Sequence, residues 1–379
     1  MTVAARPPVQ RVPFHYAGPT GSLKPYNRRW TVPTPVIMSY INRMKILVTG
    51  GCGYIGSHLV VELASAGHTP VIVDNLSNSS ARVLKRLEKI CGAEPAFYNV
   101  DLCDYDALLK VFDEHKFDAA VHIAGLKAVG ESVQQPIRYY RNNLVSTLNL
   151  VDAMQAHGVH KLVFSSSATV YGDPEEVPIV EGSPLRATNP YGQTKLMLEQ
   201  ILRDVVVSNN RWQVTILRYF NPVGAHESGL IGEDPQGEPN NLVPYIAQVA
   251  VGKRDKVKVF GNDYETSDGT GVRDYLHVVD LAKGHLNALA HMPKPGDVEI
   301  YNLGTGRGYS VLEMINAIES ASGRPIAYDI VERRPGDIAV CYADPSRAER
   351  RLGWRAEKTI DDMAVDTWRW QQNNPHGYK

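Results

Sequence analysis

The hydrophobic positions along the chain follow two alternating periods. Short β-branched apolar runs recur, each about as long as a buried strand. These runs are KILVTG, TPVIVD, AFYNVD, AAVHIAG, KLVFSSS and VTILRY. Stretches with the helical period lie between them, at 57–67, 105–116, 142–157 and 194–207. Near-continuous apolar strands that alternate with helices predict a doubly wound parallel α/β sheet. Ligands of such sheets bind at the carboxyl ends of the strands.

Composition narrows the class of protein. The 379 residues have a formal net charge of −1, so the chain lacks the excess positive charge that is typical of nucleic-acid-binding proteins. The four cysteines (Cys52, Cys91, Cys103 and Cys341) show neither paired nor metal-ligand spacing, which favours free thiols in a reducing compartment and no metal site. No apolar run approaches the roughly 20 residues that span a bilayer. We therefore expect a cytoplasmic protein that binds neither nucleic acid nor membrane.

Residues 1–43 differ from the rest of the chain. They contain no Asp or Glu, several arginines and many prolines. Such a segment cannot bury much apolar surface, which predicts a disordered leader. The lack of acidic residues is also typical of an organelle transit peptide, although the prolines argue against an amphipathic helix. The folded domain is expected to begin near Met44.

The first predicted strand runs into a glycine motif, TGGCGYIGSH, which precedes a predicted helix. Gly50, Gly53 and Gly56 have the spacing G-x-x-G-x-x-G, which allows backbone N–H groups to approach a pyrophosphate at the helix N-terminus. Asp74 ends the second strand, where a carboxylate accepts hydrogen bonds from the adenosine ribose and repels a 2′-phosphate. Ordinary turns also use these residue types. In this context they predict NAD rather than NADP.

Two later strand ends extend the predicted cofactor site. Asp101 and Leu102 follow the third strand, where a side chain can meet the adenine. Lys127 follows the fourth strand and is expected close to the ribose of the cofactor. His122 lies inside that apolar strand, and we interpret it as a core histidine with satisfied hydrogen bonds.

The stretch NPYGQTK predicts the start of a helix. Asn189 is a good N-cap, and Pro190 suits the first helical position. Tyr191 and Lys195 then lie one turn apart on one face. Alone, the pair would be an ordinary solvated one, but Ser167 ends the fifth strand at the edge where the cofactor is expected. The three residues resemble the Ser…Tyr-x-x-x-Lys constellation of the short-chain dehydrogenase/reductase superfamily.

These residue types suit hydride transfer. Removal of a hydride from an alcohol requires the hydroxyl proton to leave at about the same time, and a tyrosine phenolate can accept it. Free tyrosine titrates near 10, so ionisation near pH 7 requires roughly 4 kcal/mol. One close cation supplies about one to three pKa units. We expect Lys195 and the positive nicotinamide ring to supply the shift together, and Ser167 to orient the reacting oxygen.

From Lys45 to its C-terminus the chain resembles the UDP-glucose 4-epimerase family. The resemblance rests on the ordered segments GGCGYIGSH, HIAGLKAVGES, SSSATVYG, NPYGQTK, LRYFNPVGAH, FGNDYETSDGTGVRDYLHVVDLA, YNLGTGRGYSV and RRPGD. It implies that Tyr191 takes the proton of the sugar 4-hydroxyl while the C4 hydride passes to tightly bound NAD. The resulting 4-keto sugar swings over, and the same hydride returns to its opposite face.

The resemblance also implies two sets of contacts. Those with NAD come from Tyr54, Ile55, Asp74, Asn75, Asn78, Ser79, Asp101, Leu102, Lys127, Asn142, Lys195 and Tyr219. Those with the UDP-sugar come from Lys127, Ser167, Tyr191, Asn221, Asn241, Leu242, Phe260, Arg273, Arg334, Asp337 and Cys341. The residue types agree with this, because arginines pair with phosphate oxygens in a bidentate way and Phe260 offers an apolar surface to uracil.

Cys341 bears on specificity. It matches the position where members of the family differ in size beside the 2-substituent of the sugar. A small side chain there leaves room for an N-acetyl group, whereas a tyrosine closes the space. The resemblance therefore implies that UDP-GalNAc and UDP-GlcNAc are interconverted as well, unless Cys341 is a strand residue without a ligand contact.

Three other functions stay open. A nucleotide-sugar 4,6-dehydratase shares the first oxidation step but needs an acid and a base, and Ala168-Thr169 stand where an Asp-Glu pair is usual. A net dehydrogenase would release NADH. A non-catalytic NAD-binding sensor would not need a proton acceptor, so the Ser/Tyr/Lys set argues against it.

The resemblance implies a Rossmann-like NAD domain over 44–221 and a smaller C-terminal α/β domain for the UDP-sugar over 222–379. The segment at about 272–305 is expected to return to the first domain. Members of the family are usually homodimers, which suggests a helical interface from 105–117 and 142–157.

Overall fold

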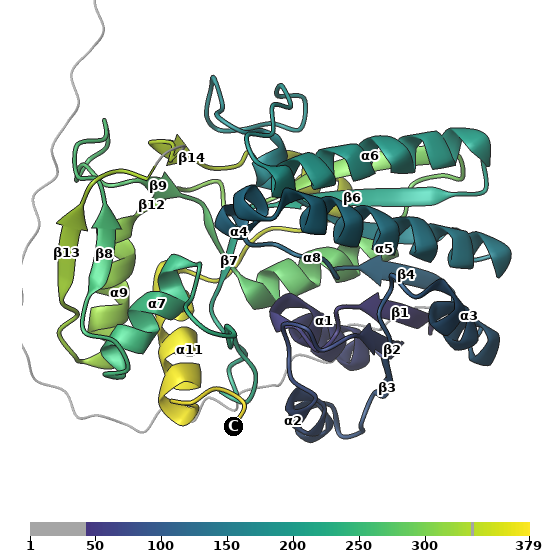
Figure 1. Cartoon of the computed structure of the whole chain (residues 1–379), viewed down its shortest axis with the longest axis horizontal. Helices are drawn as coiled ribbons and strands as arrows, with labels where there is room; N and C mark the ends of the chain where they lie inside the picture. Colours follow the sequence, from purple (N-terminus) through teal and green to yellow (C-terminus); the bar gives the residue numbers. More distant parts are fainter. Residues whose placement is uncertain (1–42, 335–336) are drawn as a thin grey trace, which may run out of the picture. The chain divides into compact units, whose positions relative to one another are not determined.

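A parallel sheet of seven strands forms the centre of the computed structural model, which describes residues 43–334 and 337–379 (Figure 1). The strand order is β11-β6-β5-β4-β1-β2-β3. The strands are β1 (Lys45–Thr49), β2 (Thr69–Asp74), β3 (Ala96–Asn99), β4 (Ala119–His122), β5 (Lys161–Ser167), β6 (Gln213–Tyr219) and β11 (Asp297–Leu303). The predicted doubly wound sheet is thus confirmed. The expected leader, apart from Arg43, lies outside the described residues.

Helices connect the strands of this sheet. They are α1 (Tyr54–Ser65), α2 (Arg82–Cys91), α3 (Tyr105–Glu114), α4 (Val129–Gln134), α5 (Pro136–Ala156), α6 (Pro190–Ser208) and α8 (Val278–Ala290). α1 and α5 begin earlier than predicted, at Tyr54 and Pro136. Gly53 caps α1 without a side-chain hydrogen bond, so the usual capping signal is missing. The first turns of α5 are largely polar, which hides their helical period.

The two faces of the sheet bury separate sets of side chains. Ile46 and Val48 of β1 point into the core beneath α1 and α8, whereas Leu47 between them points into the core beneath α3, α5 and α6. This follows from the period of two along a strand. Figure 1 shows α5 and α6 side by side along the sheet, and the two helices pack on one another. The helices therefore cover both faces and leave the carboxyl edge to the loops.

The rest of the chain builds smaller elements beyond that edge, shown at the left of Figure 1. Its strands are β7 (Asn221–Val223), β8 (Val257–Phe260), β9 (Val272–Arg273), β10 (Tyr275–His277), β12 (Tyr309–Ser310), β13 (Tyr328–Val331) and β14 (Val340–Cys341). Its helices there are α7 (Leu242–Ala250), α9 (Val311–Ser322) and α11 (Ile360–Asn373), whereas α10 (Ser346–Leu352) packs on β11 and α8. Ile246, Met314 and Trp368 belong to a third apolar core, which α7, α9 and α11 share.

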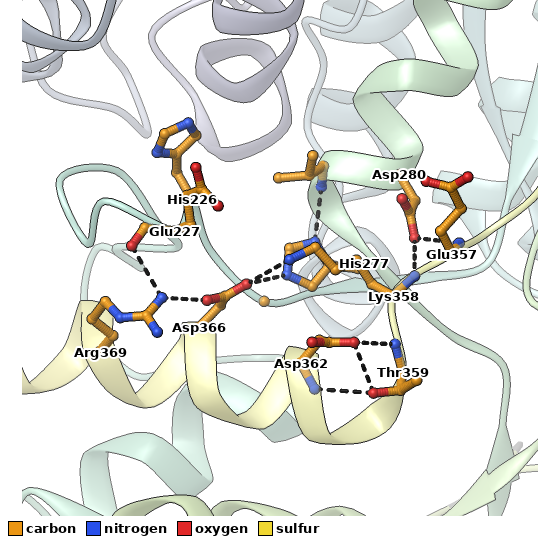
Figure 2. Close-up of polar contacts among 12 residues, drawn as sticks. His226, Glu227, His277, Asp280, Glu357, Lys358, Thr359, Asp362, Asp366 and Arg369 are labelled. Atoms are coloured by element: carbon orange, nitrogen blue, oxygen red, sulfur yellow. Dashed lines mark hydrogen bonds and ion pairs between the residues drawn. The ribbon is translucent and has the colours of Figure 1, made fainter. Parts of the chain in front are cut away.

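A buried carboxylate attaches α11 to the preceding elements. Asp366 accepts hydrogen bonds from His277 Nε2 at 3.2 Å and from Lys358 Nζ at 3.4 Å, and it also pairs with Arg369 (Figure 2). Burial favours the neutral acid, but the hydrogen bond from His277 and the charge of Lys358 outweigh it and hold the pKa of Asp366 at about 2. Asp280 of α8 accepts the backbone N–H of Lys358 at 2.8 Å. These contacts bind α11 to α8 and β10.

The glycine turn generates a prediction about stability. A Cβ at Gly56 would stand 2.1 Å from the carbonyl oxygen of Gly50, which is backbone and cannot move aside cheaply. Gly56→Ala should therefore lower the free energy of unfolding by about 1–3 kcal/mol, measured by denaturant unfolding.

Gly130 provides the matched control. It lies on α4, and a Cβ there would meet nothing within 4 Å. Gly130→Ala should leave the stability unchanged or raise it by up to about 1 kcal/mol. Equal losses in the two variants would show that the close approach at Gly56 is not what matters.

Candidate active site

The turn after β1 forms a cradle of backbone groups. Gly50 has a φ of +72°, and its N–H donates to the Val73 carbonyl at 2.8 Å. Gly53 caps α1, and neither a capping side chain nor an acidic residue occupies the first turn of this helix. The helix N-terminus carries partial positive charge and unpaired backbone donors, which suits an anionic group. Tyr54 and Ile55 form this first turn, and the Tyr54 hydroxyl donates to the Gly224 carbonyl at 2.7 Å.

Asp74 stands beside this cradle at the end of β2. One carboxylate oxygen accepts the Cys52 N–H at 3.0 Å, and the other accepts Leu76 N–H at 2.8 Å and Ser79 Oγ at 2.9 Å. Its side chain therefore holds the glycine turn and the loop after β2 together. Ser79, which the resemblance assigns to the cofactor, points at Asp74 here. Asn78 lies exposed in the same loop.

The neighbouring strand ends extend the site. Asn75 donates to Asp101 at 3.1 Å, so the ends of β2 and β3 meet as predicted from the parallel sheet. Leu102 next to Asp101 is buried. Asn142 of α5 accepts from Cys103 through its carbonyl at 3.8 Å, which places it beside the same loop. These residues form one continuous rim from the glycine turn to α5.

Ser167, Tyr191 and Lys195 come together where β5 ends. The Asn189 side chain accepts Gly192 N–H at 2.9 Å, which confirms the predicted N-cap of α6. Ser167 and Tyr191 are each 8 % exposed. Their hydroxyl groups are close enough for Ser167 to act on the pKa of Tyr191 through a hydrogen bond. Lys195 Nζ donates to the Ser165 carbonyl at 2.7 Å and stands 4.9 Å from the centre of the Phe164 ring.

The pKa values in this cluster have burial as their first cause. Burial raises the pKa of Tyr191, and the hydrogen bond with Ser167 opposes the rise. Burial lowers the pKa of Lys195 to about 8, while the charge of Glu199 opposes the fall. The protein alone therefore does not bring the phenol to ionisation near neutrality, so the sequence-based expectation requires an additional positive charge next to Tyr191. Tyr219, opposite Ser167 in the sheet, also has a raised pKa, from burial and from Tyr191.

A carboxylate missed in the sequence analysis joins two predicted ligand contacts. Glu233 accepts from Lys127 Nζ at 3.2 Å and from Asn241 Nδ2 at 2.9 Å. Lys127 follows β4 of the large sheet, whereas Asn241 caps α7, whose first residue is Leu242. The structure thus brings residues from both halves of the chain to one carboxylate. Nothing in the local pattern around Glu233 marks it, because its partners are far away in sequence.

The predicted UDP-sugar contacts lie on the smaller elements. The Arg334 guanidinium lies 4.6 Å from the centre of the Phe260 ring and pairs with Asp337 at 2.9 Å and 3.2 Å. Arg273 and Cys341 stand opposite one another on β9 and β14. Burial raises the pKa of Cys341 to about 11, and the charge of Arg273 opposes the rise. Asn221 begins β7, which continues from β6.

Three polar residues support these groups and are missing from the sequence prediction. Thr169 Oγ1 donates to Ser167 at 3.0 Å. The Asn143 side chain bonds both backbone groups of Leu126, at 2.8 Å and 3.0 Å. Asp274, fully buried, accepts hydrogen bonds from the loop at 305–306 and from Ala343, although burial still raises its pKa. Of these three residues, only Thr169 could have been found from the sequence, because it lies two residues after Ser167.

The core histidine is confirmed. One ring nitrogen of His122 lies 2.7 Å from Thr49 Oγ1, and the other lies 2.8 Å from Thr147 Oγ1. Burial lowers the pKa of His122 to about 3, so the ring is neutral.

The four cysteines are free, as predicted. No helix within the described ranges is long and apolar enough to cross a membrane.

With this geometry the class of protein is defined. The sequence matches the model of the NAD dependent epimerase/dehydratase family over residues 46–304, and the chain belongs to that family. The UDP-glucose 4-epimerase of Bacillus subtilis (strain 168) is 60 % identical over 336 residues, which cover 89 % of this chain and 99 % of that protein. The UDP-glucose 4-epimerase of Homo sapiens is 54 % identical over 341 residues, with 88 % and 98 % covered.

Solved structures agree with this assignment. The UDP-glucose 4-epimerase of Bifidobacterium longum in complex with NAD+ and UDP superposes with a TM-score of 0.85 and is 57 % identical, with 88 % of this chain and 99 % of that chain covered. The resemblance to the UDP-glucose 4-epimerases and the Rossmann-like fold are both confirmed.

Proposed function

We propose that this chain is a UDP-sugar 4-epimerase, which interconverts UDP-galactose and UDP-glucose through a 4-keto intermediate with tightly bound NAD. One observation carries the proposal: Ser167, Tyr191 and Lys195 converge at the edge of the sheet where the glycine turn forms its cradle. The relatives that carry the UDP-glucose 4-epimerase name match nearly their full length, which favours this activity over those of the wider family.

The residues of the cradle fit NAD. The close approach between Gly56 and Gly50 leaves the backbone of the turn bare, and α1 directs its N-terminus at the same place. Asn75 and Asp101 would meet the adenosine, while Asp74 still has acceptor capacity beyond its three bonds. Tyr54, Ile55, Asn78, Ser79, Leu102, Lys127, Asn142, Lys195 and Tyr219 complete the proposed cofactor contacts.

The mechanism assigns each catalytic side chain a separate role. NAD, when bound, accepts and returns the hydride and adds positive charge close to Tyr191. Tyr191 accepts the proton of the sugar 4-hydroxyl and returns it to the other epimer. Lys195, charged below about pH 8, lowers the cost of the phenolate, and Ser167 holds the reacting oxygen by a hydrogen bond. Burial of all three keeps water away from the keto sugar.

Inversion requires the sugar to turn while the nucleotide stays bound. Arg273 and Arg334 suit the diphosphate because guanidinium groups bind phosphate oxygens in a bidentate way. Phe260 would carry the uracil beside Arg334. Binding energy from these remote groups holds UDP and leaves the pyranose free to present either face. Asn221, Asn241, Leu242 and Asp337 complete the proposed substrate contacts.

The rival functions lack support at the same positions. A 4,6-dehydratase needs an acid and a base after Ser167, but Ala168 and Thr169 follow it, and Thr169 bonds Ser167 itself. A non-catalytic sensor has no use for a buried tyrosine and lysine at the strand end, because burial of these groups costs free energy.

Turnover without net redox change is the first test. The purified chain, incubated with UDP-galactose and no added NAD, should form UDP-glucose without a lasting rise in NADH absorbance. Tyr191→Phe should lower kcat by about 10²–10⁴-fold, because it removes the proton acceptor. His122→Asn, which alters a buried group outside the reaction, should keep kcat within about tenfold. Stoichiometric NADH release, or full activity in Tyr191→Phe, would contradict the proposal.

We further propose that UDP-GalNAc and UDP-GlcNAc are substrates. The support is the small Cys341 side chain opposite Arg273, which is itself a proposed phosphate contact. Cys341→Tyr should therefore abolish epimerisation of UDP-GalNAc and keep that of UDP-galactose, with both rates measured by chromatography of the products. Cys341→Ser, which keeps the side chain small, should retain both activities. Equal loss of both activities in the tyrosine variant would refute the assignment.

A homodimer through α3 and α5 is a further proposal. Leu148 of α5 is 45 % exposed and lies in the predicted interface segment 142–157. Leu148→Arg should convert the dimer to a monomer, measured by light scattering. Val207→Arg at the end of α6, where Val207 is 85 % exposed, should leave the dimer intact. A monomeric wild-type chain at micromolar concentration would contradict the proposal.

Two proposals concern the organisation of the chain. We infer that the NAD domain spans 44–221 and the UDP-sugar domain 222–379, with 272–305 returning to the first. Support comes from β11 at the edge of the large sheet and from α8, which packs on α1.

The four free cysteines support a cytoplasmic location.

A further inference from the structure

A buried ion pair anchors the helix that carries Tyr191 and Lys195. Arg218 of β6 binds Glu199 of α6 with both ends of its guanidinium, Nε to Oε1 at 2.9 Å and Nη2 to Oε2 at 2.5 Å. The two side chains are 1 % and 2 % exposed. Buried pairs with this geometry are costly to break because the remaining charge has no partner. This pair therefore fixes the distance between α6 and β6.

Further polar groups complete this pair. Ser166 Oγ donates to Glu199 Oε1 at 2.6 Å, and Arg218 Nη1 donates to the Tyr171 hydroxyl at 3.0 Å and to the Glu181 carbonyl at 3.1 Å. The Tyr171 hydroxyl donates in turn to Asn302 at 2.6 Å. The network thus joins β5, β6, β11 and the segments that follow β5. Its members come from distant parts of the sequence, so no local motif contains it.

Helix and sheet geometry align the network with the catalytic residues. Tyr191, Lys195 and Glu199 follow one another at intervals of four on the buried face of α6. On the sheet, Ser166 stands opposite Arg218, one residue before Ser167 and Tyr219. The ion pair is therefore one helical turn from Lys195 and one strand residue from Ser167.

We propose that Glu199 is a positioning residue, which sets the register of α6 on the sheet through Arg218 and Ser166 and so places Lys195 and Tyr191 against Ser167. This inference rests on the proposed epimerase function. A helix held only by apolar contacts can slide or rotate slightly, whereas a bidentate ion pair allows one arrangement. Displacement of a catalytic group by about 1 Å can cost roughly 100-fold in rate.

The charges around Lys195 allow a test by pH. Glu199 and Tyr191 lie one turn away on α6, the neutral His122 lies on β4, and Arg218 of β6 is paired with Glu199. Ser165 contributes a carbonyl from β5. Burial lowers the pKa of Lys195, and Glu199 opposes that fall. Removal of the Glu199 charge should lower the pKa further, so Lys195 would lose its proton at a lower pH.

Glu199→Gln tests the proposal in the protein with its bound NAD. We expect kcat for UDP-galactose to fall by about 10- to 100-fold, with KM changed by less than about threefold. The alkaline limb of the pH profile of kcat should move to lower pH. The fraction of NAD that stays bound through gel filtration should fall as well, because Lys195 is a proposed cofactor contact, and this readout does not depend on turnover.

Asp366→Asn is the matched control. It also removes a buried carboxylate from an arginine (Figure 2), but on α11, which lies away from the catalytic helix α6 (Figure 1). Asp366→Asn should lower Tm as Glu199→Gln does, but it should leave kcat and the alkaline limb of its pH profile unchanged. If Glu199→Gln lowers Tm but keeps kcat, the alkaline limb and the NAD content of the wild type, Glu199 is merely structural and the proposal is overturned.

Ser166→Ala keeps the test decisive if Glu199→Gln does not fold. It removes one hydrogen bond to Glu199 and leaves the ion pair, so smaller changes in the same directions are expected. Unchanged kcat, alkaline limb and NAD content in Ser166→Ala would then overturn the proposal. If the wild type does not epimerise UDP-galactose, the proposed function fails, and the NAD content of the variants still decides whether Glu199 places Lys195.

Discussion

Parallel pairing of strands places the carboxyl ends of β1, β2, β4, β5 and β6 at one edge of the sheet, because every strand in it runs in the same direction. The backbone hydrogen bonds that create this edge involve no catalytic side chain. They nevertheless bring the glycine turn, Asp74, Lys127 and Ser167 together from distant parts of the chain. A shift of one residue in the register of any strand would turn its side chains to the other face and dismantle the site. The chemistry therefore depends on the pairing of the sheet.

Burial of charge is the second requirement, and the fold meets it with dedicated partners. Arg218 and Glu199 neutralise one another, and Asp274 accepts hydrogen bonds from three backbone N–H groups and a hydroxyl. Lys195 has one carbonyl and one aromatic ring as its nearest partners, so its charge is the least compensated of the buried cations in the described part of the chain. In the proposed mechanism this favours catalysis, since a cation with few partners interacts strongly with a nearby phenolate.

Polar contacts join the two halves of the fold, beside the apolar core that Ile231, Trp370 and Tyr378 share with α1 and α2. Glu233 binds both Lys127, from the large sheet, and Asn241, from the start of α7. Tyr54 reaches from the first turn of α1 to the Gly224 carbonyl beyond β7. The contact of Lys127 is exchangeable, because a ligand with phosphate and hydroxyl groups can replace the carboxylate partner of a half-exposed lysine at little cost.

The sequence by itself determined the parallel α/β class, the glycine turn, the N-cap at Asn189 and the pairing of Tyr191 with Lys195 on one helical face. All of these follow from local periodicity or from backbone requirements within a few residues. Only the tertiary structure decided that Glu199 binds Arg218, that Glu233 joins Lys127 to Asn241, and that burial raises the pKa of Tyr191. Hydrogen bonds between residues far apart in sequence, and the loss of solvent around a charge, depend on the packed arrangement. The local pattern does not contain that information.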